Sequence, residues 1–135
     1  MNNLGITWPY RLRKGHSDNP AEGACTMDAV NWLVHGKHGD APECACSVIA
    51  TYVIRGNDAM SDDVRQRFIS DGFLHRIAGS RSAEHEAARV RVFVLAAARI
   101  FAASAMDGVR LPEQAAKLRA IPDDAAYSEI EKTAA

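Results

Sequence analysis

Apolar residues recur every three or four positions in two stretches of the N-terminal half, residues 20–35 and residues 43–57. This period places apolar side chains on one side of an α-helix. Each stretch also follows a helix start signal, a polar capping side chain close to a proline: Asp18 or Asn19 for the first stretch and Asp40 for the second. The pattern predicts two helices. The run 48–54 would also fit a buried strand, but the flanking signals favour a helix.

The longest helical pattern extends over residues 82–106. Its middle, RVRVFVL, alternates like a strand, but its flanks are rich in alanine and glutamate, which are strong helix formers. Arg91 and Arg99 interrupt the segment, so it does not resemble a membrane span. We expect it to be the central and most buried helix. Its predicted core face consists of Ala87, Val90, Val94, Ala97, Phe101 and Ala105.

Shorter elements complete the prediction. Ser61 and the two aspartates after it predict a short helix to about residue 69, which is followed by a turn at 73–77. Prolines mark the starts of two further helices, over 112–120 and 122–132.

The first nineteen residues show no sustained period and are expected to form an irregular arm over 1–19, with Trp8 and Tyr10 docked on the body. Together the elements predict an all-α fold. We expect a single compact domain over residues 1–135, with about five to six helices around the long central helix 82–106.

Composition agrees with this class, since 47% of the 135 residues are apolar and 24% are charged. The N-terminus lacks the apolar run of a signal peptide, so we expect a cytoplasmic protein with reduced cysteines. The net charge of −1 is unevenly distributed: residues 21–63 are acidic, whereas residues 64–99 contain seven arginines against three acids.

The N-terminal half also contains a set of short motifs: Trp8-Pro9-Tyr10-Arg11, Glu22-Gly23-x-Cys25-x-Met27-Asp28-Ala29-Val30, Asp40-x-Pro42-Glu43-Cys44, Asn57-Asp58, Arg65-Gln66 and Arg76-Ile77-x-Gly79. The set resembles a widespread, uncharacterised family of small bacterial and phage proteins over about residues 7–80. The resemblance implies no activity, no cofactor and no catalytic residue. Occurrence in phages points to a role in mobile elements.

Cysteines and histidines supply weak candidates for a metal site: Cys25, Cys44, Cys46, His35 and His38. Structural zinc needs four ligands, usually in short pairs, and the chain has no C-x-x-C. If Cys44 and Cys46 share a helix, their side chains point about 200° apart. We therefore expect no metal and no cofactor, and interpret the thiols as small buried groups between the first two helices.

Catalysis by Cys25 is an alternative, because the start of a helix lowers a thiol pKa and histidines exist to act as a base. No histidine lies at a spacing that forces contact with Cys25, and no common nucleotide-binding, protease or hydrolase motif is present. The acid pairs Asp62-Asp63 and Asp123-Asp124 follow capping or proline positions, where acids favour helix starts.

The arginine block suggests a binding surface, with Arg65, Arg81, Arg89 and Arg99 as candidate partner-binding residues. Pairing with the acidic block of the same chain is the favoured alternative. The leading hypothesis is a non-catalytic protein-interaction module or small inhibitor that binds a protein with an acidic surface, encoded by a phage or mobile element. Nucleic-acid binding and a metal- or thiol-dependent enzyme remain the alternatives.

Overall fold

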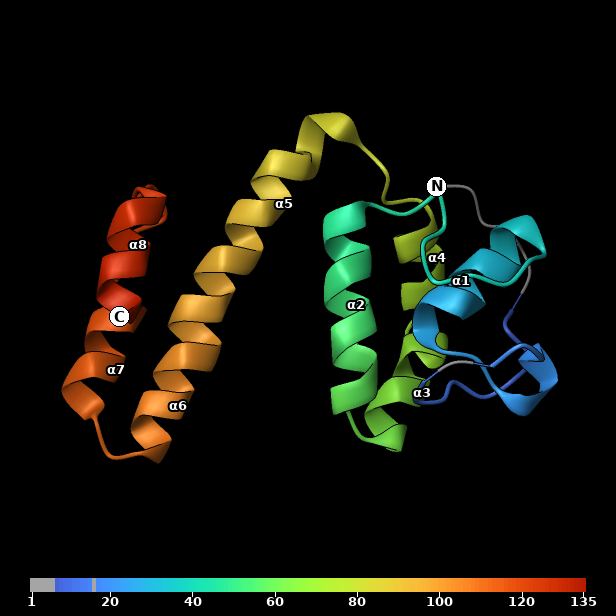
Figure 1. Cartoon of the computed structure of the whole chain (residues 1–135), viewed down its shortest axis with the longest axis horizontal. Coiled ribbons are helices and arrows are strands. Elements are labelled where there is room, and N and C mark those ends of the chain that lie inside the picture. The colour runs from blue at the N-terminus through green and yellow to red at the C-terminus, as the bar shows by residue number, and fades with distance from the viewer. Residues whose placement is uncertain (1–6, 16) are drawn as a thin grey trace. The chain divides into compact units, whose positions relative to one another are not determined.

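The computed structural model describes residues 7–15 and 17–135, and these residues form helices and connecting loops without a β-strand (Figure 1). The predicted all-α class is confirmed. None of the described helices combines the length and the apolar character that a membrane crossing requires. The elements are η1 (Pro20–Glu22), α1 (Thr26–His35), α2 (Ser47–Ala59), α3 (Asp62–Ser70), α4 (Phe73–Ala78), α5 (Ala83–Ala96), η2 (Ala97–Ala102), α6 (Ala103–Gly108), α7 (Pro112–Arg119) and α8 (Tyr127–Ala134).

Contacts within the chain gather into two compact units, Met1–Glu86 and Ala87–Ala135. The sequence predicts one domain over residues 1–135, and each unit has a hydrophobic core of its own. The predicted long helix is confirmed, since α5, η2 and α6 follow one another without a break from Ala83 to Gly108.

The N-terminal unit is built around α1, which packs against α2 and α4. All six residues from Thr26 to Asn31 are buried. The expectation that the segment 82–106 is the most buried helix is wrong, because Leu95, Ala98 and Ala103 are its buried residues. Helix α1 is more buried because neighbouring helices and the N-terminal arm cover several of its sides.

The described part of the arm docks on this unit through backbone and side-chain contacts. Trp8 and Leu12 are buried in the core, whereas Tyr10 is 40% exposed, so the predicted docking holds for Trp8. Gln66 of α3 accepts a hydrogen bond from the Leu12 amide at 2.9 Å and donates one to the Leu12 carbonyl at 2.7 Å. Residues 1–6 and 16 of the predicted arm lie outside the described residues.

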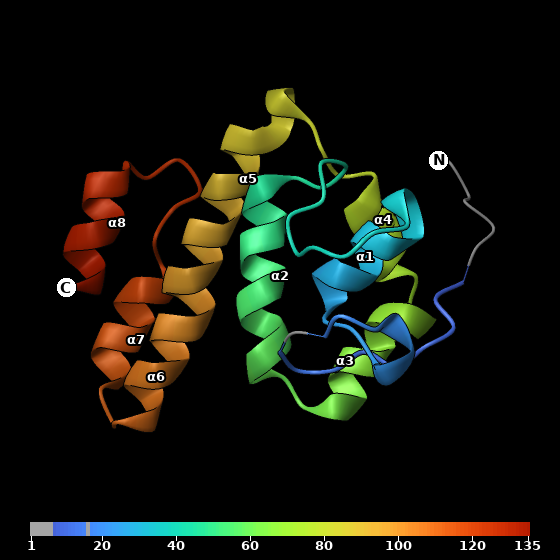
Figure 2. The same ribbon diagram turned by 45° about the vertical axis from the view of Figure 1, so that its right-hand side comes forward.

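In the C-terminal unit, α7 and α8 lie alongside the long helix (Figures 1 and 2). Leu95, Ala98 and Ala103 face this core. Ala98 and Ala103 are five residues apart, which is the step of the π-helical turn η2. The predicted core face is wrong, because five of its six residues are exposed, namely Ala87, Val90, Ala97, Phe101 and Ala105, and Phe101 is 60% exposed. Helices α7 and α8 cover the neighbouring side of the long helix, which carries Leu95, Ala98 and Ala103.

Several helix boundaries differ from the prediction. The first helix begins at Thr26 because Cys25 is its N-cap, while Pro20–Glu22 form a separate 3-10 turn. The second begins at Ser47, and the predicted turn at 73–77 is the short helix α4. Helix α8 begins at Tyr127, several residues after the proline that was expected to start it.

Candidate functional site

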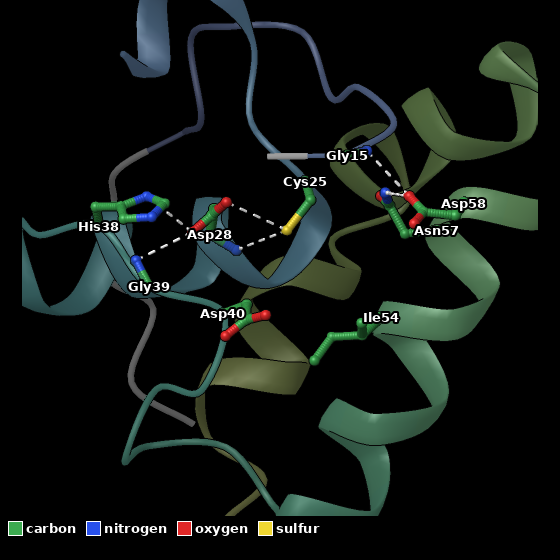
Figure 3. Close-up of a pocket in the computed structure, with 9 residues that line it drawn as sticks. All are labelled: Gly15, Cys25, Asp28, His38, Gly39, Asp40, Ile54, Asn57 and Asp58. Carbon is green, nitrogen blue, oxygen red and sulfur yellow. Dashed lines mark hydrogen bonds and ion pairs between the residues drawn. The ribbon is translucent and has the colours of Figure 1, made fainter. Parts of the chain in front are cut away.

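A cavity of about 300 Å³ opens in the N-terminal unit beside the first turn of α1 (Figure 3). Cys25 and Asp28 line it from α1, and His38, Gly39 and Asp40 line it from the loop after that helix. The last turns of α2 and the arm complete the wall with Ile54, Asn57, Asp58 and Gly15. Segments distant in the sequence therefore converge on one small space with both polar and apolar walls.

Cys25 and Asp28 form a local pair at the start of α1. The Cys25 Sγ accepts a hydrogen bond from the Asp28 amide at 3.4 Å and donates one to the Asp28 Oδ2 at 3.4 Å. Burial, together with the negative charge of Asp28, raises the pKa of Cys25 to about 12. The helix start lowers a thiol pKa as predicted, but burial outweighs that effect, and Cys25 is a protonated thiol at neutral pH.

Asp28 also holds the loop that follows α1. Its carboxylate is buried, and Oδ1 accepts a hydrogen bond from the Gly39 amide at 3.0 Å and lies 3.2 Å from the His38 Nδ1. Gly39 has a φ of 139°, and a Cβ added to it would lie 3.0 Å from the Asn31 Nδ2. The close approach of the loop to α1 thus depends on a glycine at this position.

The opposite wall is fixed by Asn57, whose side chain is buried. Its Oδ1 accepts hydrogen bonds from the Thr26 amide and hydroxyl at 3.1 and 2.9 Å, and its Nδ2 donates to the Arg13 carbonyl at 3.0 Å. Asp58 accepts from the Gly15 amide at 3.0 Å, and that bond, with a smaller contribution from Asn57, lowers the pKa of Asp58. Asn57 thus ties α1, α2 and the arm together.

The metal-site candidates are only partly brought together. Cys25 and His38 line the cavity, whereas His35, Cys44 and Cys46 do not. Cys46 is the N-cap of α2, and its amide donates to the Ser80 Oγ at 2.9 Å. Among the described residues, no group of three or more potential ligands is placed to hold a metal ion.

Arg65 is buried, with 2% of its surface exposed. Its Nε donates to the Asn57 carbonyl at 2.9 Å and its Nη2 to the Met60 carbonyl at 2.7 Å, and Nη1 pairs with Asp62. These carbonyls belong to the C-terminal end of α2, where they have no partner within the helix. The charge of Arg65 therefore serves the fold and is not available to a partner.

The remaining candidate arginines also have partners inside the chain. Arg81 donates to the Glu43 carbonyl at 2.8 Å. Arg99 donates to the Ile121 carbonyl at 2.7 Å and pairs with Asp123 at 2.7 Å. Arg89, on α5, also interacts with another group of the chain. Arg65 and Arg81 belong to the N-terminal unit and Arg89 and Arg99 to the C-terminal unit.

The long helix carries a second surface that the sequence assigned in part to the core. We call it the apolar face and define it as Val92, Ala97, Ile100, Phe101 and Ala105, all exposed. Val92, Ile100 and Phe101 are 64%, 58% and 60% exposed. Along the same helix, Arg91 and Arg99 point to carbonyls of the segment between α7 and α8.

Comparison with known protein families, with curated proteins and with solved structures yields no match. The site therefore rests on its own geometry. Reasoning from the sequence missed Asp28, Asn57 and Asp58 as site residues, and it missed the exposure of Phe101. One available signal was that Asp28, Asp40 and the pair Asn57-Asp58 all belong to the motifs that carry the resemblance.

Proposed function

We propose that this protein acts by binding another protein through the apolar face of its long helix. The observation that carries the proposal is the exposure of Val92, Ile100 and Phe101, each more than half exposed, on one helix. Ile100 lies next to Phe101 in the sequence, and Ala97 and Ala105 lie one turn from Phe101 on either side, all exposed. Exposed apolar patches of this kind mark interaction sites. Burying each of the larger side chains against a partner contributes roughly 1.5–3 kcal/mol.

Catalysis is less well supported. A thiol whose pKa is about 12 offers almost no thiolate at neutral pH, and the acceptor next to it is the Asp28 carboxylate. A nucleophilic cysteine requires a positive or basic neighbour that stabilises the thiolate. The enzyme alternative centred on Cys25 thus lacks the electrostatics that it needs.

Nucleic-acid binding is also less well supported. The arginines on which it depends donate to carbonyls and carboxylates of this chain, as Arg65, Arg81 and Arg99 illustrate. Phosphate binding would have to compete with those contacts, and salt would weaken it further. For the same reason the partner contact that we propose is apolar, and an acidic surface on the partner is not required.

Affinity capture with matched variants tests the proposal. The resemblance to bacterial and phage proteins makes extracts of a bacterial host, with and without phage, the first source of a partner. The double variant Ile100→Ser and Phe101→Ser removes two apolar anchors and is expected to weaken binding of the captured partner about 100-fold or more. Circular dichroism shows whether the variant keeps its helices.

Val109→Ser is the control, because Val109 is 66% exposed but lies beyond the long helix, at the C-cap of α6. It is expected to bind as the natural chain does. Equal affinity of the natural chain and the double variant for the captured partner contradicts the proposal, as does a failure of the natural chain to capture any partner.

A further inference from the structure

The loop 36–40, which we call the strap, turns back from the end of α1, and its Gly39 lies against Asp28 and Asn31 of the same helix. Three strap residues, His38, Gly39 and Asp40, line the cavity (Figure 3). The opposite wall comes from α2 and the arm, through Asn57 and Gly15. The strap is therefore the part of the wall formed by a loop rather than by a helix or the docked arm.

One side chain fastens the strap to α1. The Asp28 Oδ1 accepts from the Gly39 amide at 3.0 Å and lies 3.2 Å from the His38 Nδ1, so two successive strap residues are held by one oxygen. The other oxygen of the same carboxylate accepts from the Cys25 thiol at 3.4 Å. Asp28 thus connects the strap directly to the thiol inside the cavity.

A flexible position lies where the strap leaves the helix. Gly36 has a φ of 63° and is the C-cap of α1, and a Cβ built on it would meet no atom within 4 Å. The Gly36 N–H donates to the Trp32 carbonyl at 3.0 Å, so this hydrogen bond fixes the end of the helix, while no side chain packs against the glycine. The backbone beyond that bond can change φ and ψ at little cost because the residue is a glycine. Hinges commonly consist of a few such residues at the end of an element.

We propose that the strap is a gate on the cavity, latched by the Asp28 carboxylate and hinged at Gly36. In the closed state the strap narrows the cavity and limits access to Cys25, which is half-buried. Release of Gly39 and His38 from Asp28 moves the strap away from α1 and widens the access to Cys25 from solution. The gate belongs to the N-terminal unit and does not depend on the protein-binding function proposed above.

The test compares Asp28→Asn with Asp40→Asn. Both substitutions remove one negative charge from the cavity wall with little change in size, but the latch contacts are made by Asp28. Two quantities are measured near pH 8: alkylation of each cysteine by iodoacetamide, resolved by mass spectrometry, and amide hydrogen exchange of Gly39 by NMR.

In Asp28→Asn, alkylation of Cys25 and exchange of the Gly39 amide are each expected to become roughly tenfold faster or more, since a charged hydrogen-bond acceptor is lost. Asp40→Asn is expected to change both by less than about threefold. Faster alkylation alone, with slow Gly39 exchange, would mean that Asp28 acts only on the acidity of the thiol. That result overturns the gate, and so do equal effects of the two variants or no effect of Asp28→Asn.

Cys46 reports on global unfolding, because its side chain is buried at the start of α2. If Asp28→Asn also makes Cys46 reactive, the milder variant His38→Ala shows whether the strap opens without global unfolding. It removes one of the two latch contacts at a side chain that is 35% exposed. A severalfold increase in Gly39 exchange with Cys46 still protected supports the gate, and unchanged exchange overturns it.

Discussion

At the scale of single residues, buried polar groups organise the N-terminal unit. Asn57 uses its amide oxygen and its amide nitrogen to hold Thr26 and Arg13, while Asp28 holds the strap and Cys25. Such groups are costly to bury without partners, so each fixes the position of the segments that it contacts. The cavity owes its shape to these two side chains.

The thiol of Cys25 makes stability depend on pH in a defined direction. Burial raises its pKa from 9.0 to about 12, so the unfolded chain loses this proton at lower pH than the folded chain does. The contribution of this thiol to stability is complete below about pH 9 and is lost as the pH rises towards 12. The variant Cys25→Ser has no thiol at this position, so its stability lacks this contribution to the pH dependence.

Denaturant unfolding of the natural chain and of Cys25→Ser at several pH values checks this pH dependence of the stability. The difference in the free energy of unfolding between the two proteins is expected to be largest below pH 9 and to narrow between pH 9 and pH 12. A constant or widening difference would show that the folded state does not raise the pKa of the thiol.

At the scale of elements, Arg65 joins α3 to the C-terminal end of α2. Arg65→Ala leaves the Asn57 and Met60 carbonyls without their donors and is expected to lower the free energy of unfolding by about 3 kcal/mol. Arg67 is the matched control on the same helix, because it is exposed and pairs with Asp71 at 3.5 Å. Arg67→Ala is expected to cost less than about 0.5 kcal/mol.

Urea titrations of the two variants and of the natural chain measure these free energies of unfolding. Equal losses of stability would mean that the buried contacts of Arg65 do not stabilise the end of α2. A variant Arg65→Ala that is as stable as the natural chain would return Arg65 to the set of possible partner-binding residues.

Two helix starts could be predicted from residue types. Ser61 lies at the N-cap position of α3, although its side chain makes no capping hydrogen bond, and Pro112 is the first residue of α7. The start of α1 at Thr26 could not be predicted, because a cysteine is an unusual N-cap and its role depends on the fold around Asp28. The π-helical turn η2 inserts a step into an otherwise regular pattern, and alanine-rich sequence gives no sign of it.

At the scale of the whole molecule, the class of fold follows from the pattern of the chain, but the cavity does not. Asp28 and Gly39 are eleven residues apart, and Gly15 and Asp58 are 43 apart, so the contacts between them require the complete fold. The apolar face was hidden for a different reason. A helix with apolar residues on two sides does not reveal from sequence alone which side its neighbours cover.

Methyl NMR shows most directly whether the apolar face binds a partner. The captured partner is titrated into protein labelled at valine and isoleucine methyl groups, and the Val92 and Ile100 signals are compared with that of Val109, which is equally exposed but lies off the face. If the apolar face binds the partner, the Val92 and Ile100 signals shift or broaden as the complex forms while the Val109 signal stays in place. Unchanged Val92 and Ile100 signals, with shifts confined to other parts of the chain, would contradict it.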